Sequence, residues 1–306
     1  MSPSVGALRR ASLVLLLAAL IWGSMIPVLA ALAEHYDNWL LSWSRYILGL
    51  PVLWLAVLLS KPPVAPPRPL QWGRLLRLGA AMTAFSVLYT FGVAHAHPAT
   101  SAIVLMCGPI WATLLSRVML GSTTPPGFFF TLVLVVAGGI VVVLGTPGRA
   151  PGSFGLQGGE GLLVIAQLCW SWYSIRAQQW LSDRGQIALS ALTSTVASVL
   201  LGVVCAVVWA LGGLVWPTRP PTPVEWGMVV WIGVLGVAVA VLLWNTGVSL
   251  VGVPVASLFA NSAPVFAIGL AALMGREPSW LQVAGGFIVL GGIALHQIRQ
   301  TRAAQR

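Results

Sequence analysis

The chain has 306 residues, of which 58% are hydrophobic and only 7% are charged. A soluble domain usually carries roughly 25% charged residues because its surface faces water, and a disordered chain is poor in apolar residues. These numbers exclude both classes and leave the lipid bilayer as the solvent. The three cysteines lie inside apolar runs, without the spacing of a disulfide framework or a zinc site.

Ten apolar runs are long enough for transmembrane helices, which need about 20 mostly apolar residues each. In chain order they cover approximately residues 11–33, 40–60, 75–96, 98–120, 127–146, 161–181, 187–212, 226–248, 254–274 and 279–298. None alternates apolar and polar residues as a membrane barrel would. The first run resembles a cleavable secretory signal, but its length of 23 residues favours a retained helix. The predicted fold class is an all-α polytopic membrane protein.

The basic residues indicate the orientation of these helices. With the N-terminus in the cytoplasm, 12 Lys and Arg residues fall in inside segments and 3 in outside loops, while five of the six acidic residues fall outside. Cytoplasmic loops carry such an excess of basic residues. We therefore expect a multi-pass protein of the cell (inner) membrane with both termini cytoplasmic. The same sorting accounts for the net charge of +10 without a nucleic-acid partner.

The two halves of the chain resemble each other at an offset near 150 residues. Matched positions, in order, are Trp22 with Trp170, Trp72-Gly73 with Trp226-Gly227, Gly92-Val93 with Gly247-Val248, Pro109 with Pro264, and Gly138-Gly139 with Gly291-Gly292. This predicts two five-helix repeats, residues 1–148 and 149–306, which together form one membrane domain. Because five is odd, the second repeat enters the membrane from the opposite side. Such inverted repeats are typical of secondary transporters, in which exchanging the conformations of the repeats alternates access.

Several segments carry a family resemblance. Trp22-Gly23-Ser24, the segment 41–46 (Leu-Ser-Trp-Ser-Arg-Tyr), the helices of Pro109 and Pro264, and the turn 275–279 (Gly-Arg-Glu-Pro-Ser) are similar to EamA-type members of the drug/metabolite transporter superfamily. The resemblance spans nearly the whole chain and implies ten helices in two repeats, with helices 1–4 and 6–9 enclosing the substrate path. The chain departs from the family after Gly121, where Ser122 replaces the usual acidic residue.

Arg45 is the most informative polar residue because it lies within the second run. It follows Trp39 by six residues, so helix rise places it roughly 9 Å inward of the interface. A charge at that depth costs about 2.5–3.5 kcal/mol or more and is tolerated facing a cavity or a partner. The guanidinium is predicted to bind an anionic group of the substrate. Alternatively, it snorkels to the interface or pairs with Glu34, Asp37 or Glu277.

Further candidate substrate-binding residues lie at mid-helix depth. Trp22 and Trp170 occupy equivalent points of the two repeats, and they either line a cavity together with Tyr89 or pack between helices. Asn245, Asn261 and Ser101 are hydrogen-bonding groups inside apolar runs, suited either to polar contacts with the substrate or to bonds between helices. The complete predicted set is Arg45, Trp22, Trp170, Tyr89, Asn245, Asn261 and Ser101.

We expect no cofactor, metal or catalytic residue. His95 and His97 have no visible third ligand, and nucleotide-binding and hydrolase motifs are missing. The glycine pairs of helices 5 and 10 suggest scaffold helices and a possible homodimer contact. No acidic residue lies deep in a span, which argues against a proton relay.

The function predicted is export of a small organic metabolite, such as an amino acid, by alternating access. The alternatives are a multidrug or lipophilic-compound efflux carrier and, from another class, a membrane-embedded enzyme or lipid-handling protein. The last would require His95, His97 and a carboxylate to converge on one point.

Overall fold

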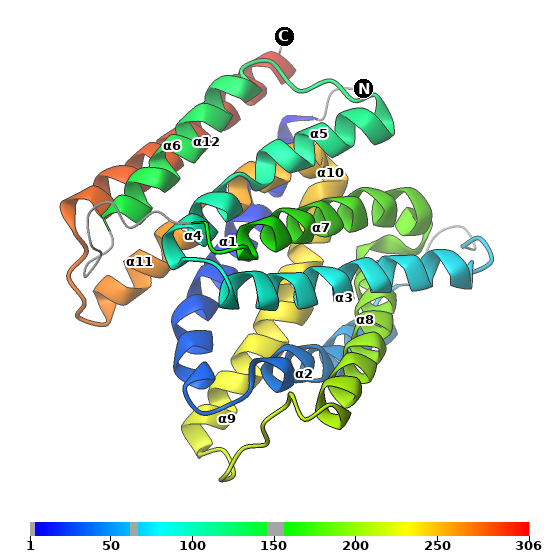
Figure 1. Ribbon diagram of the computed structural model, residues 1–306. Helices are drawn as coiled ribbons and strands as arrows, with labels where there is room; N and C mark the ends of the chain where they lie inside the picture. Colours follow the sequence, from blue (N-terminus) through cyan, green and yellow to red (C-terminus); the bar gives the residue numbers. More distant parts are fainter. Residues whose placement is uncertain (1–3, 62–66, 146–155, 306) are drawn as a thin grey trace.

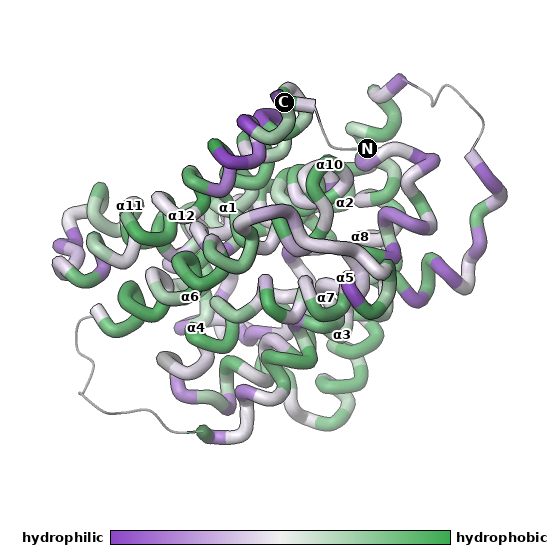
Figure 2. Tube along the Cα trace, turned by 90° about the horizontal axis from the view of Figure 1, so that it is seen from above, coloured by the Kyte–Doolittle hydropathy of each residue, from purple (hydrophilic) through white to green (hydrophobic). Residues whose placement is uncertain are grey.

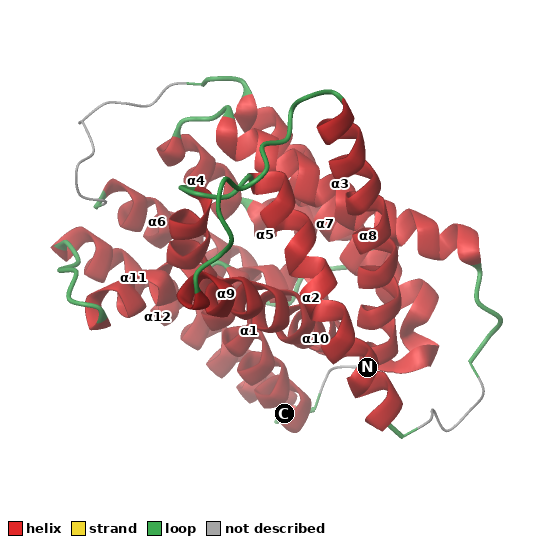
Figure 3. Ribbon diagram, turned by 90° about the horizontal axis from the view of Figure 1, so that it is seen from below, coloured by secondary structure: helices red, strands yellow, loops and turns green. Residues whose placement is uncertain are grey.

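The computed structural model describes residues 4–61, 67–145 and 156–305. Within these ranges the regular structure is entirely helical, and Figure 3 shows helices joined by loops without a strand. The elements in the first half are α1 (Val5–Ala33), α2 (Asn38–Leu59), α3 (Trp72–Ala94), α4 (Pro98–Met106), α5 (Gly108–Leu120) and α6 (Phe128–Leu144). Those in the second are α7 (Gly159–Leu181), η1 (Ser182–Arg184), α8 (Gly185–Ala210), α9 (Pro223–Val230), η2 (Trp231–Val239), α10 (Ala240–Ala260), α11 (Ala263–Leu273) and α12 (Trp280–Ala304).

These elements supply the ten predicted membrane spans. By length and composition alone, six described helical stretches are apolar enough to cross a bilayer, or seven with the bent pair α4–α5. Two of these stretches are longer than one predicted span. In the first, η1 separates α7 from α8, and in the second, Gly252, at φ 78°, kinks α10. Residues 253–260 join α11 as the ninth span, and α6 is a shorter apolar helix. Figure 2 shows apolar residues along most helices and hydrophilic ones concentrated at the ends and loops.

Polar residues cap the starts of several helices and separate one apolar run from the next. Asp37 caps α2 by accepting a hydrogen bond from the Trp39 amide at 2.7 Å. Thr222 with Glu225, and Ser279 with Gln282, form reciprocal capping boxes at the starts of α9 and α12. Each cap satisfies amide groups that the first helical turn leaves without a partner. The six acidic residues accordingly stand at helix ends and turns, including Glu160 in the first turn of α7.

The helix contacts repeat when the two halves are exchanged. Contacts between the halves have counterparts made by the equivalent helices. The contact of α3 with α7 corresponds to that of α10 with α1, and the contact of α3 with α8 corresponds to that of η2 with α2. The contact of α5 with α7 likewise corresponds to that of α11 with α1. The pairs α2–α8 and α6–α12 join equivalent helices of the two halves. Figure 1 shows α6 and α12 side by side, and the start of α1 and the end of α12 at the same end of the molecule. This interleaving confirms two inverted five-helix repeats. The predicted boundary between residues 148 and 149 lies outside the described residues.

The fourth and ninth spans are each divided into two helices. The fourth is broken at Cys107 between α4 and α5, and the ninth at Asn261–Ser262 before α11. Both breaks stand just before a proline, Pro109 or Pro264, that can donate no amide hydrogen bond to the preceding turn. The eighth span also differs, since its central nine residues, η2, form a π-helix.

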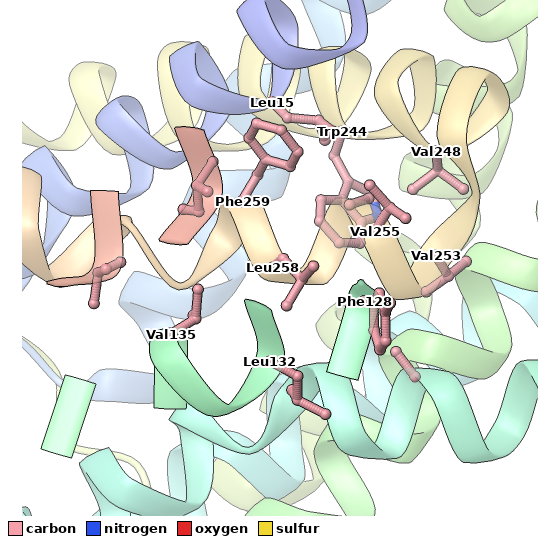
Figure 4. Close-up of a cluster of buried hydrophobic side chains, with 14 of the residues drawn as sticks. Leu15, Phe128, Leu132, Val135, Trp244, Val248, Val253, Val255, Leu258 and Phe259 are labelled. Atoms are coloured by element: carbon pink, nitrogen blue, oxygen red, sulfur yellow. The ribbon is translucent and has the colours of Figure 1, made fainter. Parts of the chain in front are cut away.

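The largest apolar core surrounds α10, between α1, α5 and α6. Figure 4 shows Trp244 and Phe259 of α10 facing Leu15 of α1, with Phe128 and Leu132 of α6 on the other side. Trp244 is 1% exposed. This core holds the second half of the eighth span rigidly against the first repeat.

Candidate substrate-binding site

Arg45 lies in the second span without a counter-charge. It is half-buried, and its buried Nε has no hydrogen-bond partner. Tyr46 and Tyr89 are titratable groups within electrostatic range of the guanidinium. The one ion pair among the described residues joins Arg219 and Glu225, with 2.7 Å between Nη2 and Oε1. Arg45 is therefore a positive charge that no acidic side chain neutralises.

The acidic residues considered as partners of Arg45 are not bonded to it. The two carboxylate oxygens of Asp37 accept the amides of Trp39 at 2.7 Å and Val215 at 3.2 Å. Glu34 ends α1, and Glu277 lies between α11 and α12, without an ion pair to Arg45 in the part of the chain that is described. The structure accordingly holds no gate formed by Arg45 and a carboxylate.

Aromatic rings from both repeats meet in one group, here called the aromatic cluster: Trp22, Phe85, Tyr89, Trp170, Tyr173 and Trp244. Trp22 and Trp170 pack edge to face at 6.1 Å between centroids, and both contact Trp244, at 5.7 and 5.8 Å. Phe85 contacts Trp170 at 5.0 Å and Tyr89 at 5.7 Å. Tyr89 lies within electrostatic range of Arg45, so the aromatic cluster extends toward this charge.

The two repeat-related tryptophans differ in their hydrogen bonding. Both are half-buried, but the indole N–H of Trp22 donates to the carbonyl of Gly236 in η2 at 3.2 Å. In the described structure the indole N–H of Trp170 has no such acceptor, and it is not enclosed. The N–H of Trp170 thus remains available to a bound solute. The acceptor of Trp22, in contrast, belongs to a π-helix, a widened form of helix that is frequent at functional sites.

The close approach of η2 to α2 depends on glycine. A Cβ built on Gly233 would lie 2.7 Å from the Leu48 Cβ and 3.1 Å from the Arg45 carbonyl oxygen. A Cβ on Gly49 would lie 2.9 Å from the Gly233 carbonyl. Sequence reasoning missed this π-helical contact, and its only signal is the pair of glycines, Gly233 and Gly236, inside an apolar run.

Asn245 lies behind the aromatic cluster and is 0% exposed. Its amide nitrogen donates to the Tyr173 hydroxyl at 3.1 Å and to the Ser190 hydroxyl at 2.9 Å. The Tyr173 hydroxyl also forms a 3.2 Å hydrogen bond with the hydroxyl of Thr193. Thr193 corresponds to Arg45 at the same offset that pairs Trp22 with Trp170. Asn245 therefore joins three spans of the second repeat and reaches the cluster only through Tyr173.

Asn261 connects the two helix breaks. Its amide donates at 2.7 Å to the carbonyl of Met106, which the break before Pro109 leaves free. Gln167 of α7 similarly donates to the Leu105 carbonyl at 3.1 Å. The carbonyls freed at this break are thus bonded to side chains of other spans. Ser101 of α4 is 4% exposed, with no hydrogen-bond partner for its hydroxyl.

Four of the seven predicted residues, Arg45, Tyr89, Trp22 and Trp170, therefore belong to one region. Asn245 and Asn261 bond neighbouring spans, and Ser101 is buried on α4. Two residues that sequence reasoning did not select also belong there. Phe85 bridges Trp170 and Tyr89, and Tyr46 shares a 3.3 Å hydrogen bond with Ser86 beside Arg45. Neither has a sequence signal beyond lying within an apolar run.

The histidine turn does not form a metal or catalytic site. His95 is exposed, bonds the Phe91 carbonyl through Nδ1 at 2.9 Å and stacks on the Phe91 ring. Nearby Glu160 accepts from Thr100 at 2.7 Å and from the amides of Gln157 and Gly158. No group of three or more His, Cys, Asp or Glu side chains able to hold a metal occurs among residues 4–61, 67–145 and 156–305.

Known proteins match the chain in both halves. It matches the EamA-like transporter family over residues 9–144 and 157–296. The "Uncharacterized transporter YyaM" of Bacillus subtilis (strain 168) is 22% identical over 214 residues, 68% of this chain and 67% of that protein. The "Probable terminal-alkyne amino-acid exporter" of Streptantibioticus cattleyicolor is 31% identical over 134 residues, 44% of this chain and 42% of that protein. A solved crystal structure shares the fold, with TM-score 0.77 and 20% identity over 96% of this chain and 98% of that one.

The two matched segments contain the first and the second five spans respectively. Together with the apolar helices and the inverted repeat, they place the chain among multi-pass membrane transporters and not among enzymes. The chain belongs to the EamA-like transporter family.

Proposed function

We propose that the protein exports a small organic metabolite such as an amino acid by alternating access. The observation that carries the proposal is Arg45, a guanidinium within a span that has no acidic partner and lies within electrostatic range of Tyr89 of the aromatic cluster. A substrate carboxylate supplies the missing counter-charge through charge-assisted hydrogen bonds. The cluster then accepts the apolar body of the substrate.

The aromatic rings also suit the other charge of an amino acid. The six acidic residues stand at helix ends and turns, so no mid-span carboxylate is present to bind an ammonium group. Faces of Trp attract an ammonium group within about 6 Å of the ring centre. The half-buried rings of Trp22 and Trp170 are the candidates. The exporter relative matched over 134 residues adds support for an amino-acid substrate.

The test measures export from cells that express the wild type, Arg45→Ala, Arg45→Lys or Arg117→Ala. Amino acids and related metabolites in the medium are quantified by mass spectrometry. We expect Arg45→Ala to reduce export roughly 10- to 150-fold, because a lost hydrogen bond to a charged group costs about 1.5–3 kcal/mol. Lysine keeps the charge and should retain part of the activity.

Arg117 is the matched control because it is exposed, at the end of α5 and away from the cluster. Its replacement should leave export unchanged. Equal export by the wild type and Arg45→Ala, at equal protein levels, would contradict the proposal. Export of neutral lipophilic compounds that does not depend on Arg45 would favour the multidrug alternative.

We also propose that the protein resides in the cell (inner) membrane with both termini in the cytoplasm. The support is the excess of basic residues in the segments assigned to the inside. A reporter enzyme that is active only outside the cytoplasm should be inactive when fused after Gln305 and active when inserted after Thr218, in the loop between α8 and α9. The reverse pattern would overturn the orientation.

A homodimer through α6 and α12 is the last part of the proposal. Gly138 and Gly285 face each other within one chain, where a Cβ on Gly138 would lie 2.9 Å from the Gly285 carbonyl. Gly291, in contrast, is exposed and has open space around it. A dimer contact on this face should be weakened by Gly291→Leu, and an unchanged elution volume in size-exclusion chromatography would argue against it.

A further inference from the structure

Arginines from α3 and α7 surround one tryptophan at the membrane end of these two helices. The guanidinium carbons of Arg74, Arg77 and Arg176 lie 5.5, 6.0 and 5.6 Å from the centre of the Trp180 ring. Arg68 and Arg184 line the surface pocket beside the same ring. We call this group of five arginines and Trp180 the arginine cluster.

The arginine cluster holds far more positive than negative charge. Asp183 is the one acidic residue that lines its pocket, and it accepts the backbone amide of Arg68 at 2.9 Å. Asp183 forms no ion pair with any arginine in the described ranges. Five basic groups and one acidic group leave a local charge of +4. Like charges held this close repel one another, so the arrangement favours a bound anion.

The hydrogen bonds of the cluster leave donors free. The Arg184 guanidinium donates to the Arg68 carbonyl, and Arg176 donates from Nη1 to the Gln179 side chain at 2.7 Å. The Nε of Arg176 is buried without a partner. Arg74 and Arg77 are exposed and make no hydrogen bond to the described residues. Guanidinium groups of this kind match the oxygens of a phosphate group.

The position of the cluster identifies the source of the phosphate as lipid. Trp72 and Leu76, four residues apart on one face of α3, are 72% and 54% exposed, so α3 contacts the bilayer at the level of the arginines. Exposed tryptophan marks the headgroup level. The pocket is an open surface notch that Arg68, Arg74 and Arg184 line together with Trp180. Basic pockets between transmembrane helices bind anionic headgroups in this way.

We propose that the arginine cluster binds the phosphate of an anionic phospholipid, which bridges α3 and α7. These two helices belong to different repeats, so a bound lipid holds the halves together at one end of the molecule. The proposal does not depend on the exported solute.

Native mass spectrometry of the detergent-purified protein tests this inference. Phosphatidylglycerol and phosphatidylcholine are titrated separately, and inorganic phosphate is added as a competitor. We expect binding of phosphatidylglycerol to weaken roughly fivefold in Arg77→Gln and about 25-fold in Arg74→Gln/Arg77→Gln, which corresponds to about 1 kcal/mol per basic residue near an anionic surface. Phosphatidylcholine should bind weakly to every variant, and millimolar phosphate should not displace the lipid.

The pair Arg9→Gln/Arg10→Gln is the matched control, because it removes two exposed charges at the start of α1, away from the cluster. It should bind phosphatidylglycerol like the wild type. Size-exclusion chromatography confirms folding, and Arg74→Lys/Arg77→Lys, which keeps both charges, should retain most of the binding. Equal loss in both glutamine pairs, undiminished binding by Arg74→Gln/Arg77→Gln, or equal binding of phosphatidylcholine overturns the inference. Displacement of the lipid by phosphate alone overturns the assignment to lipid.

Discussion

Replacing Gly285 by alanine would put a methyl group where α12 and α6 leave no room for one. The added Cβ would lie 2.6 Å from both the Gly138 carbonyl oxygen and the Val142 amide nitrogen. Ordinary contact begins at 3.4 Å, so the two helices would have to separate by about 0.8 Å, the difference between these distances. Both obstacles are backbone atoms and cannot rotate away.

The expected energy has two opposing contributions. Overpacking of this kind typically costs about 1–3 kcal/mol. Alanine in place of glycine in a helix gains about 0.8–1.0 kcal/mol. We therefore expect Gly285→Ala to lower the free energy of unfolding by up to about 2 kcal/mol, with transport lost at temperatures where the wild type is still active.

Gly269→Ala provides the comparison that isolates the packing cost. Gly269 lies within α11, is exposed, and has no atom within 4 Å of the place that an added methyl group would occupy. This variant should gain the helix-propensity contribution alone, so the difference between the two variants measures the overpacking. Unfolding is followed by circular dichroism of the purified protein in detergent. Equal stability of the two alanine variants would refute the helix-contact reasoning.

Two further predictions separate structural from substrate-binding residues. Asn245→Ala should lower the free energy of unfolding by roughly 1 kcal/mol, because it removes two hydrogen bonds between spans worth about 0.6 kcal/mol each. Unchanged stability together with an altered substrate range would show that Asn245 binds the substrate instead. Trp22→Phe should reduce stability slightly, since the hydrogen bond to Gly236 is lost, whereas Trp170→Phe should keep stability and weaken export. Melting temperatures and export rates, measured together on both tryptophan variants, check this difference; identical effects would contradict it.

Much of the candidate site could be predicted from the sequence, because a charged residue within an apolar run is rare. Arg45 stands out since a buried guanidinium is costly, and Trp22 and Trp170 stand out since they match across the repeats. Asn245 and Asn261 could not be interpreted in the same way. A polar amide within an apolar run satisfies either a substrate or another helix, and only the neighbours decide. Here the neighbours are Tyr173, Ser190 and the Met106 carbonyl.

The solvent, the number of spans and the inverted repeat could all be predicted from the order of the residues. These features follow from local quantities: the length of apolar runs, the placement of Lys and Arg, and matched residues at a nearly constant offset. Which polar groups remain unpaired depends instead on how the helices pack. The contact of the π-helix η2 with α2 and the meeting of five arginines at Trp180 each involve residues far apart in the chain. Pairing energies of this kind arise only when the helices come together, so no local pattern encodes them.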